Sequence, residues 1–63
     1  MDLRVKELLE DTLKKFGISK ARAGREMGYS NSMISAYTTG AYQGDVPKLE
    51  KTIEQWCNRQ LKA

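Results

Sequence analysis

Apolar side chains recur every three or four positions near both ends of the chain. This spacing places each set on one face of an α-helix, so it predicts amphipathic helices over residues 2–16 and from residue 46 onward. The N-terminal set comprises Val5, Leu8, Leu9, Thr12, Leu13 and Phe16. The C-terminal set comprises Val46, Leu49, Ile53, Trp56, Cys57 and Leu61. We expect Trp56 and Cys57 to pack against the N-terminal helix.

Residues that favour helix ends divide the middle of the chain into two shorter helices, expected over residues 20–27 and 31–39. Serine and aspartate are good N-caps, and glycine readily ends a helix. The expected caps and stops are Asp2, Gly17, Ser19, Gly28, Ser30, Gly40 and Asp45. The segment AYTTGAY also permits a weak β-hairpin, but no convincing strand is present. The sequence therefore predicts an all-α domain of four helices.

A glycine stands in the middle of the second helix, where it costs about 1 kcal/mol relative to alanine. This residue, Gly24, is explained if residues 20–27 cross residues 31–39 so closely that a larger side chain would separate them. Gly28 then serves the turn between them, because glycine tolerates a positive φ. Two short helices joined in this way predict a helix-turn-helix over residues 19–40. Its expected shared core face comprises Met27, Tyr29, Ile34 and Tyr37.

Composition limits the functions open to this chain. Its 63 residues suffice for one domain, expected over residues 1–63. With no histidine and one cysteine, it lacks an internal disulfide, the usual zinc ligands and the usual nucleophile–base pairs. No G-x-x-x-x-G-K-[ST] phosphate loop occurs, so we expect neither an enzyme nor a cofactor within these residues. The absence of a signal peptide and of a long apolar run predicts a cytoplasmic protein without a membrane segment.

Positive charge is concentrated in one part of the chain. The net charge is +3, but residues 14–28 contain five basic side chains against Glu26 alone, whereas residues 29–44 contain no charge. A concentration of this kind favours a polyanionic partner. The alternative is an ordinary solvated helix surface.

Residues 19–40 resemble the helix-turn-helix of the phage repressor and Cro family. That pattern has a small residue in mid-helix, a turn glycine four positions later and an aliphatic residue six positions beyond, which are Gly24, Gly28 and Ile34 here. The family usually has alanine where this chain has Gly24. The resemblance implies a small four-helix, lambda repressor-like domain that binds double-stranded DNA.

A narrower resemblance covers nearly the whole chain and is clearest over residues 34–56, which look like the N-terminal domain of transposition protein B, the AAA+ ATPase of Mu-like phages. The residues that carry it are Tyr42, Gly44, Asp45 and Trp56. The resemblance implies that the chain is the N-terminal fragment of a larger ATPase that captures target DNA and delivers it to a transposase. ATP and Mg²⁺ would then bind in a domain C-terminal to residue 63. The alternatives are a small phage-type transcriptional regulator and a helical protein-interaction module.

The family geometry places the helix over residues 31–39 in the major groove, with its N-terminal residues facing base edges. The residues expected to face the groove are Ser30, Asn31, Ser32 and Ser35. The residues expected to contact phosphates are Lys20, Arg22, Arg25, Thr38, Thr39 and Tyr42. Capping is the alternative role for Ser30, and an ion pair with Glu26 or an acid of the first helix is the alternative for Arg25. Because only Asn31 offers an amide to the bases, we expect weak sequence preference.

Overall fold

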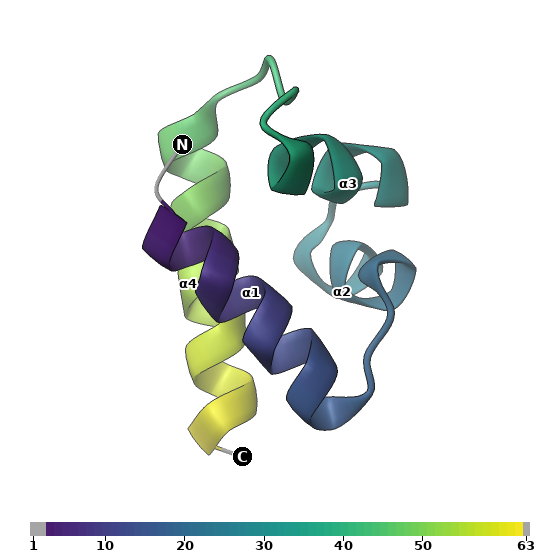
Figure 1. The fold of residues 1–63 in the computed structure, drawn as a ribbon, viewed down its shortest axis with the longest axis vertical. Helices are drawn as coiled ribbons and strands as arrows, with labels where there is room; N and C mark the ends of the chain where they lie inside the picture. Colours follow the sequence, from purple (N-terminus) through teal and green to yellow (C-terminus); the bar gives the residue numbers. More distant parts are fainter. Residues whose placement is uncertain (1–2, 63) are drawn as a thin grey trace.

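The computed structural model describes residues 3–62, and all of its regular structure in this range is α-helical. The four helices are α1 (Leu3–Phe16), α2 (Lys20–Met27), α3 (Asn31–Thr39) and α4 (Val46–Lys62). Figure 1 shows α1 lying across α4, with the shorter α2 and α3 together on one side of them. The prediction of four helices is confirmed. The weak hairpin is wrong, because Tyr37, Thr38 and Thr39 belong to α3.

Local hydrogen bonds at the helix starts confirm three of the predicted N-caps. The hydroxyl of Ser19 accepts from the Arg22 amide at 3.1 Å, and that of Ser30 accepts from the Met33 amide at 3.2 Å. A carboxylate oxygen of Asp45 accepts from the amide of Lys48 at 3.1 Å. Each bond satisfies a backbone donor that a helix start otherwise leaves unpaired. The predicted cap Asp2 lies outside the described residues.

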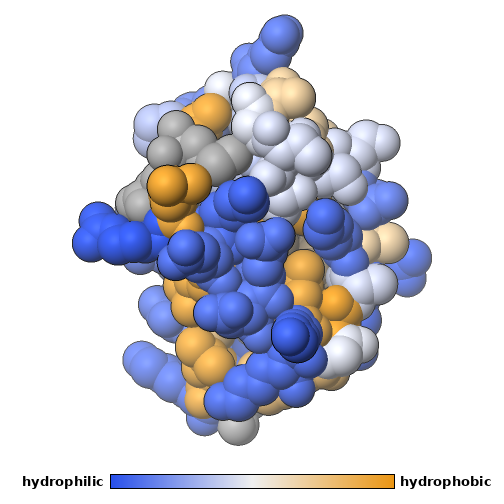
Figure 2. Space-filling view, viewed as in Figure 1, coloured by the Kyte–Doolittle hydropathy of each residue, from blue (hydrophilic) through white to orange (hydrophobic). Residues whose placement is uncertain are grey.

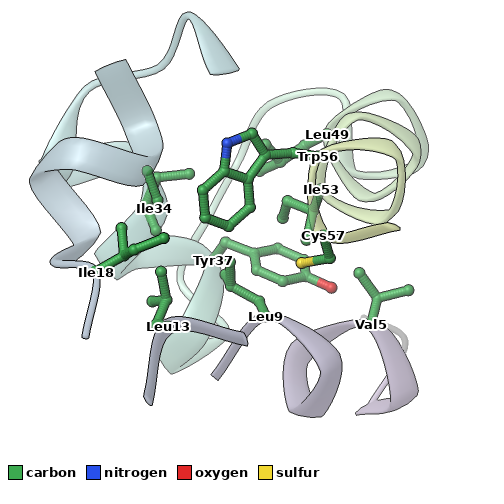
Figure 3. Close-up of a cluster of buried hydrophobic side chains, with 11 residues drawn as sticks. Val5, Leu9, Leu13, Ile18, Ile34, Tyr37, Leu49, Ile53, Trp56 and Cys57 are labelled. Carbon is green, nitrogen blue, oxygen red and sulfur yellow. The ribbon is translucent and has the colours of Figure 1, made fainter. Parts of the chain in front are cut away.

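The hydrophobic core fills the space between the α1–α4 pair and α3. Leu9 of α1, Ile34 of α3 and Ile53 of α4 are fully buried. Figure 3 shows the Trp56 indole reaching from α4 into the middle of this core. Thr12, the polar member of the α1 face, is buried and donates its hydroxyl to the Leu8 carbonyl at 2.7 Å. The predicted apolar faces of α1 and α4 are therefore confirmed at most of their positions.

Two predicted core residues lie on the surface instead. Phe16 and Leu61 each have 44% of their surface exposed. Both belong to the C-terminal ends of their helices, where Figure 1 shows α1 and α4 diverging, so neither helix covers the other there. The Phe16 ring is covered in part by its neighbour Lys15, whose ammonium lies 5.6 Å from the ring centre. None of the helices within residues 3–62 combines the length and apolarity that crossing a membrane requires.

Candidate nucleic-acid interface

The close approach of α2 and α3 depends on Gly24. A Cβ atom at this position would lie 2.6 Å from the Tyr29 carbonyl oxygen and 3.1 Å from Cγ1 of Ile34. The first distance is far below van der Waals contact, and the obstacle is backbone that no rotamer change can move. The prediction that close packing explains Gly24 is therefore confirmed, and the closest neighbours are the backbone of the connecting turn and Ile34 of α3.

Gly28 serves the turn for a different reason. Its φ of +84° lies in the left-handed region, whereas an added Cβ would meet nothing within 4 Å. The requirement is conformational and not steric, because side chains other than glycine seldom adopt a positive φ. The Tyr29 amide then donates to the Gly24 carbonyl at 2.7 Å, which closes the end of α2. Three residues, 28–30, thus join α2 to α3.

The start of α3 presents uncharged polar groups to solvent. Ser30, Asn31 and Ser32 are exposed, and Ser35, one turn later, is half-buried. The Ser30 hydroxyl accepts the capping bond, which is the alternative role that the sequence suggested for it. In Figure 2 a pale surface of intermediate hydropathy covers the area where Figure 1 draws α3, with both hydrophilic and hydrophobic surface beside it. The four residues predicted to face a DNA groove therefore lie together at one end of α3.

The basic side chains of α2 differ in how freely they reach solvent. Arg22 and Arg25 are exposed, and within residues 3–62 Arg25 has no ion pair. Lys20 is half-buried, and its ammonium donates to the Thr38 hydroxyl at 3.3 Å. The two arginines are therefore the cations of α2 that are best placed for an anionic partner.

Thr38, which the sequence predicted to contact phosphate, is buried. Only 6% of its surface is exposed, and its hydroxyl donates to the Ser35 carbonyl at 2.9 Å while accepting from Lys20. This hydroxyl connects α2 to the C-terminal end of α3, so the expected phosphate contact is incompatible with its burial. Thr39, the next residue, is exposed, and within residues 3–62 its hydroxyl bonds only to the Ala36 carbonyl of its own helix, at 3.1 Å.

The three tyrosines lie in or beside the core. Tyr37 is 1% exposed and donates its hydroxyl to Glu50 of α4 at 2.7 Å. Tyr29 and Tyr42 are partly buried and pack against the core. The Tyr42 ring lies directly over Gly44, where even a Cβ would collide with it. The Tyr-x-Gly spacing that the sequence singled out thus has a local packing role in the α3–α4 connection.

An unpredicted hydrogen-bond chain connects α4 to the basic side of α2. The Trp56 indole N–H donates to Oε1 of Glu26 at 2.9 Å, and Nε of Arg22 donates to Oε2 of the same carboxylate at 3.1 Å. The indole bond, followed by the Arg22 bond, lowers the pKa of Glu26 below its ordinary value of 4.5. Glu26 is thus held ionised at neutral pH, with both oxygens engaged.

The sequence indicated one of the two hydrogen bonds to Glu26, the one from Arg22. Arg22 and Glu26 are four positions apart, a spacing at which oppositely charged side chains meet on a helix surface. The sequence-based interpretation considered Arg25 as the partner of Glu26, but the structure pairs Glu26 with Arg22. Trp56 lies 30 residues beyond Glu26, and nothing local in the sequence indicates that the two side chains meet.

Within residues 3–62 no three histidine, cysteine, aspartate or glutamate side chains gather closely enough to hold a metal ion. Comparisons with protein families, with curated proteins and with solved structures give no significant match to this chain.

Proposed function

We propose that α2 and α3 form a helix-turn-helix that binds double-stranded DNA, with the N-terminal half of α3 in the major groove. The observation that carries the proposal is the uncharged, exposed start of α3, together with two exposed arginines on α2, the helix packed against it. With its side chains an α-helix is about 10–12 Å across, and the major groove is about 12 Å wide, so α3 fits the groove in width. The contact at Gly24 supports the proposal, since it fixes α3 relative to α2.

Each exposed group has a role in this proposal. Arg22, Arg25 and Thr39 contact phosphates, and the half-buried Lys20 and Tyr42 lie at the margins of the interface. Asn31 faces the bases, where an amide can pair with adenine through two hydrogen bonds. Ser32 and Ser35 add hydroxyls that accept either kind of base edge or a phosphate. The Ser30 hydroxyl has first to satisfy its cap bond.

We expect this interface to prefer sequences only weakly. One bidentate pair contributes about 1–3 kcal/mol of discrimination. Dedicated regulators exceed their non-specific binding by about 4–10 kcal/mol, which a single amide cannot supply. Binding should therefore remain near the non-specific scale, with dissociation constants of about 10⁻⁴–10⁻⁶ M at physiological salt.

A finer assignment follows from the resemblance described for residues 34–56. We propose that the domain serves DNA transposition, as the DNA-binding part of an ATPase that captures target DNA for a transposase. Weak sequence preference suits a protein that must accept many target sites, which favours this role over an operator-binding regulator. Its ATP and Mg²⁺ would bind in a part of the protein that follows residue 63.

The decisive experiment is an NMR titration of the ¹⁵N-labelled chain with a short duplex. We expect saturable shifts at the start of α3 and along α2, with the surface formed by α1 and α4 little changed. Shifts confined to α1 and α4 contradict the assignment of the interface to α2 and α3. No shifts at millimolar duplex contradict DNA binding and favour the protein-interaction module. A parallel selection from a random duplex pool identifies the regulator instead if one site is bound a thousandfold more tightly than its scrambled control. A mild A·T preference that disappears in Asn31→Ala is the expected result.

A further inference from the structure

Glu26 is the only acidic residue between Asp11 and Asp45, and it lies on the helix whose arginines are proposed to contact DNA. Every other charge in residues 14–44 is positive. An acid in this position opposes the binding of a phosphate backbone. Its role therefore needs an explanation beyond that of an ordinary surface residue.

Two hydrogen bonds restrain the carboxylate of Glu26, whereas in the described part of the chain only one nitrogen of the Arg22 guanidinium is used. Trp56 holds one oxygen of Glu26 from α4, so this carboxylate is fixed from outside its own helix. Arg22 uses its inner nitrogen, Nε, for the other oxygen, and within residues 3–62 its two terminal nitrogens have no hydrogen-bond partner. The Arg22 side chain is 63% exposed and that of Glu26 38% exposed, so an incoming anion can reach the pair.

We propose that Glu26 competes with DNA phosphate for Arg22 and thereby limits the affinity of the domain for DNA. This inference rests on the proposed function. Carboxylate and phosphate bind a guanidinium through the same fork of N–H donors, so Arg22 cannot satisfy both fully. Because the indole fixes Glu26, the carboxylate does not swing away when DNA arrives. The lowered pKa of Glu26 keeps the competitor charged throughout the neutral range.

The expected effect is moderate because the ion pair is exposed. Exposed ion pairs are weak, and the loss of one corresponds to about 1.4- to 5-fold in affinity. Removing the charge of Glu26 should therefore tighten DNA binding by about 1.4- to 5-fold. Arg22 would then neutralise a phosphate more completely, so the plot of log K against log salt should steepen by up to about 0.9.

The test measures the affinity of a fluorescently labelled duplex for the parent, Glu26→Gln, Arg22→Ala and the double variant at several salt concentrations. Glu7→Gln is the matched control, because it removes the same charge from an exposed position of α1. We expect Glu26→Gln to bind more tightly than both the parent and Glu7→Gln, and this advantage to disappear when Arg22 is alanine. Equal effects of the two glutamine variants, or weaker binding by Glu26→Gln, overturn the inference.

A second measurement needs no variant and so does not depend on Glu26→Gln folding. In the parent, the Arg22 Nε–H resonance should shift in parallel with DNA binding while the Trp56 indole N–H resonance stays nearly constant. A constant Arg22 resonance alongside clear backbone shifts in α3 overturns the inference and leaves the proposed function standing. A parent that binds no duplex overturns the proposed function, and the inference with it.

Discussion

The two helix pairs of this domain are held together by opposite means. Large buried side chains such as Leu9, Ile53 and Trp56 separate α1 from α4 and fill the space between them. In the α2–α3 pair the absence of a side chain at Gly24 lets the backbone of the following turn approach α2 directly. One pair is stabilised by the area it removes from water, and the other by a fixed close contact.

This difference separates the source of stability from the proposed site of function. Among the residues that the structure describes, the α1–α4 pair contributes seven buried hydrophobic residues, whereas the start of α3 remains polar and exposed. Substitutions in the first pair should therefore change unfolding, and substitutions on the exposed side of the second should change binding. Five variants test this division, arranged by their expected effect on the free energy of unfolding.

The largest effect is expected from Leu9→Ala. Leu9 is fully buried, and truncation of a buried leucine costs about 2–5 kcal/mol through lost transfer energy and the cavity left behind. A domain of this size has a total stability of about 3–9 kcal/mol, so the variant should be close to unfolding. Urea unfolding followed by circular dichroism measures the loss. The control Leu61→Ala, at an exposed position of α4, should change stability by less than about 0.5 kcal/mol.

Gly24→Val should come next. Valine forms helices better than glycine, so propensity alone predicts stabilisation. The added side chain would instead collide with the Tyr29 carbonyl, and overpacking of this kind costs about 1–3 kcal/mol. Ala21→Val places the same side chain on the exposed surface of α2 and should lower the free energy of unfolding by only a few tenths of a kcal/mol, roughly the difference in helix propensity. A higher melting temperature for Gly24→Val would falsify the packing explanation.

Ser30→Ala tests whether one hydroxyl serves both the fold and the interface. Loss of an N-cap costs about 1 kcal/mol, and the cap bonds of Ser19 and Ser30 are nearly equal in length, at 3.1 and 3.2 Å. Ser19→Ala and Ser30→Ala should therefore lower stability by similar amounts in thermal unfolding. In the duplex titration only Ser30→Ala should alter the shifts at the start of α3. If Ser19→Ala and Ser30→Ala change DNA binding equally, the Ser30 hydroxyl is not part of the interface.

Glu26→Gln has a pH-dependent effect on stability. The pKa of Glu26 is lower in the folded than in the unfolded state, so its contribution is complete above about pH 4.5 and is lost as the pH falls through the folded value. The variant lacks this contribution at every pH. The stability difference between parent and variant should therefore narrow from pH 6 to pH 3 in urea unfolding. A constant difference across that range would show that the Trp56 and Arg22 bonds do not favour the charged carboxylate.

The smallest effect on stability is expected from Arg25→Ala, because this side chain is exposed. Its effect should be on DNA binding instead. Loss of one phosphate contact reduces the slope of log K against log salt by about 0.9, and it should weaken all duplex sequences by similar factors. Lys51→Ala, which removes an exposed cation from α4, is the control. If both variants bind alike, the phosphate contacts have been assigned to the wrong side of the domain.

The features that the sequence predicted are those determined by near neighbours in the chain. Cap residues such as Ser19 and Ser30 act within three positions, so the helix limits follow directly from them. Gly24 was interpretable because its helical cost demands a packing reason. The burial of Thr38 and the bond between Trp56 and Glu26 depend on contacts with other helices, which helical periodicity does not specify. Helical periodicity likewise identified the inward faces of α1 and α4. It did not indicate that the two helices diverge at their C-terminal ends, where Phe16 and Leu61 are exposed.

The one cysteine of the chain allows the separation of α1 from α4 to be measured as a rate of thiol labelling. Cys57 is fully buried, its thiol lies 3.9 Å from the Leu8 carbonyl, and burial raises its pKa. A thiol reagent therefore reacts only with molecules in which α1 and α4 have separated, and the labelling rate follows the population of that open state. Duplex DNA bound to α2 and α3 slows the labelling only if both helix pairs open together. The thiol thus reports whether the domain opens as one cooperative unit or as two.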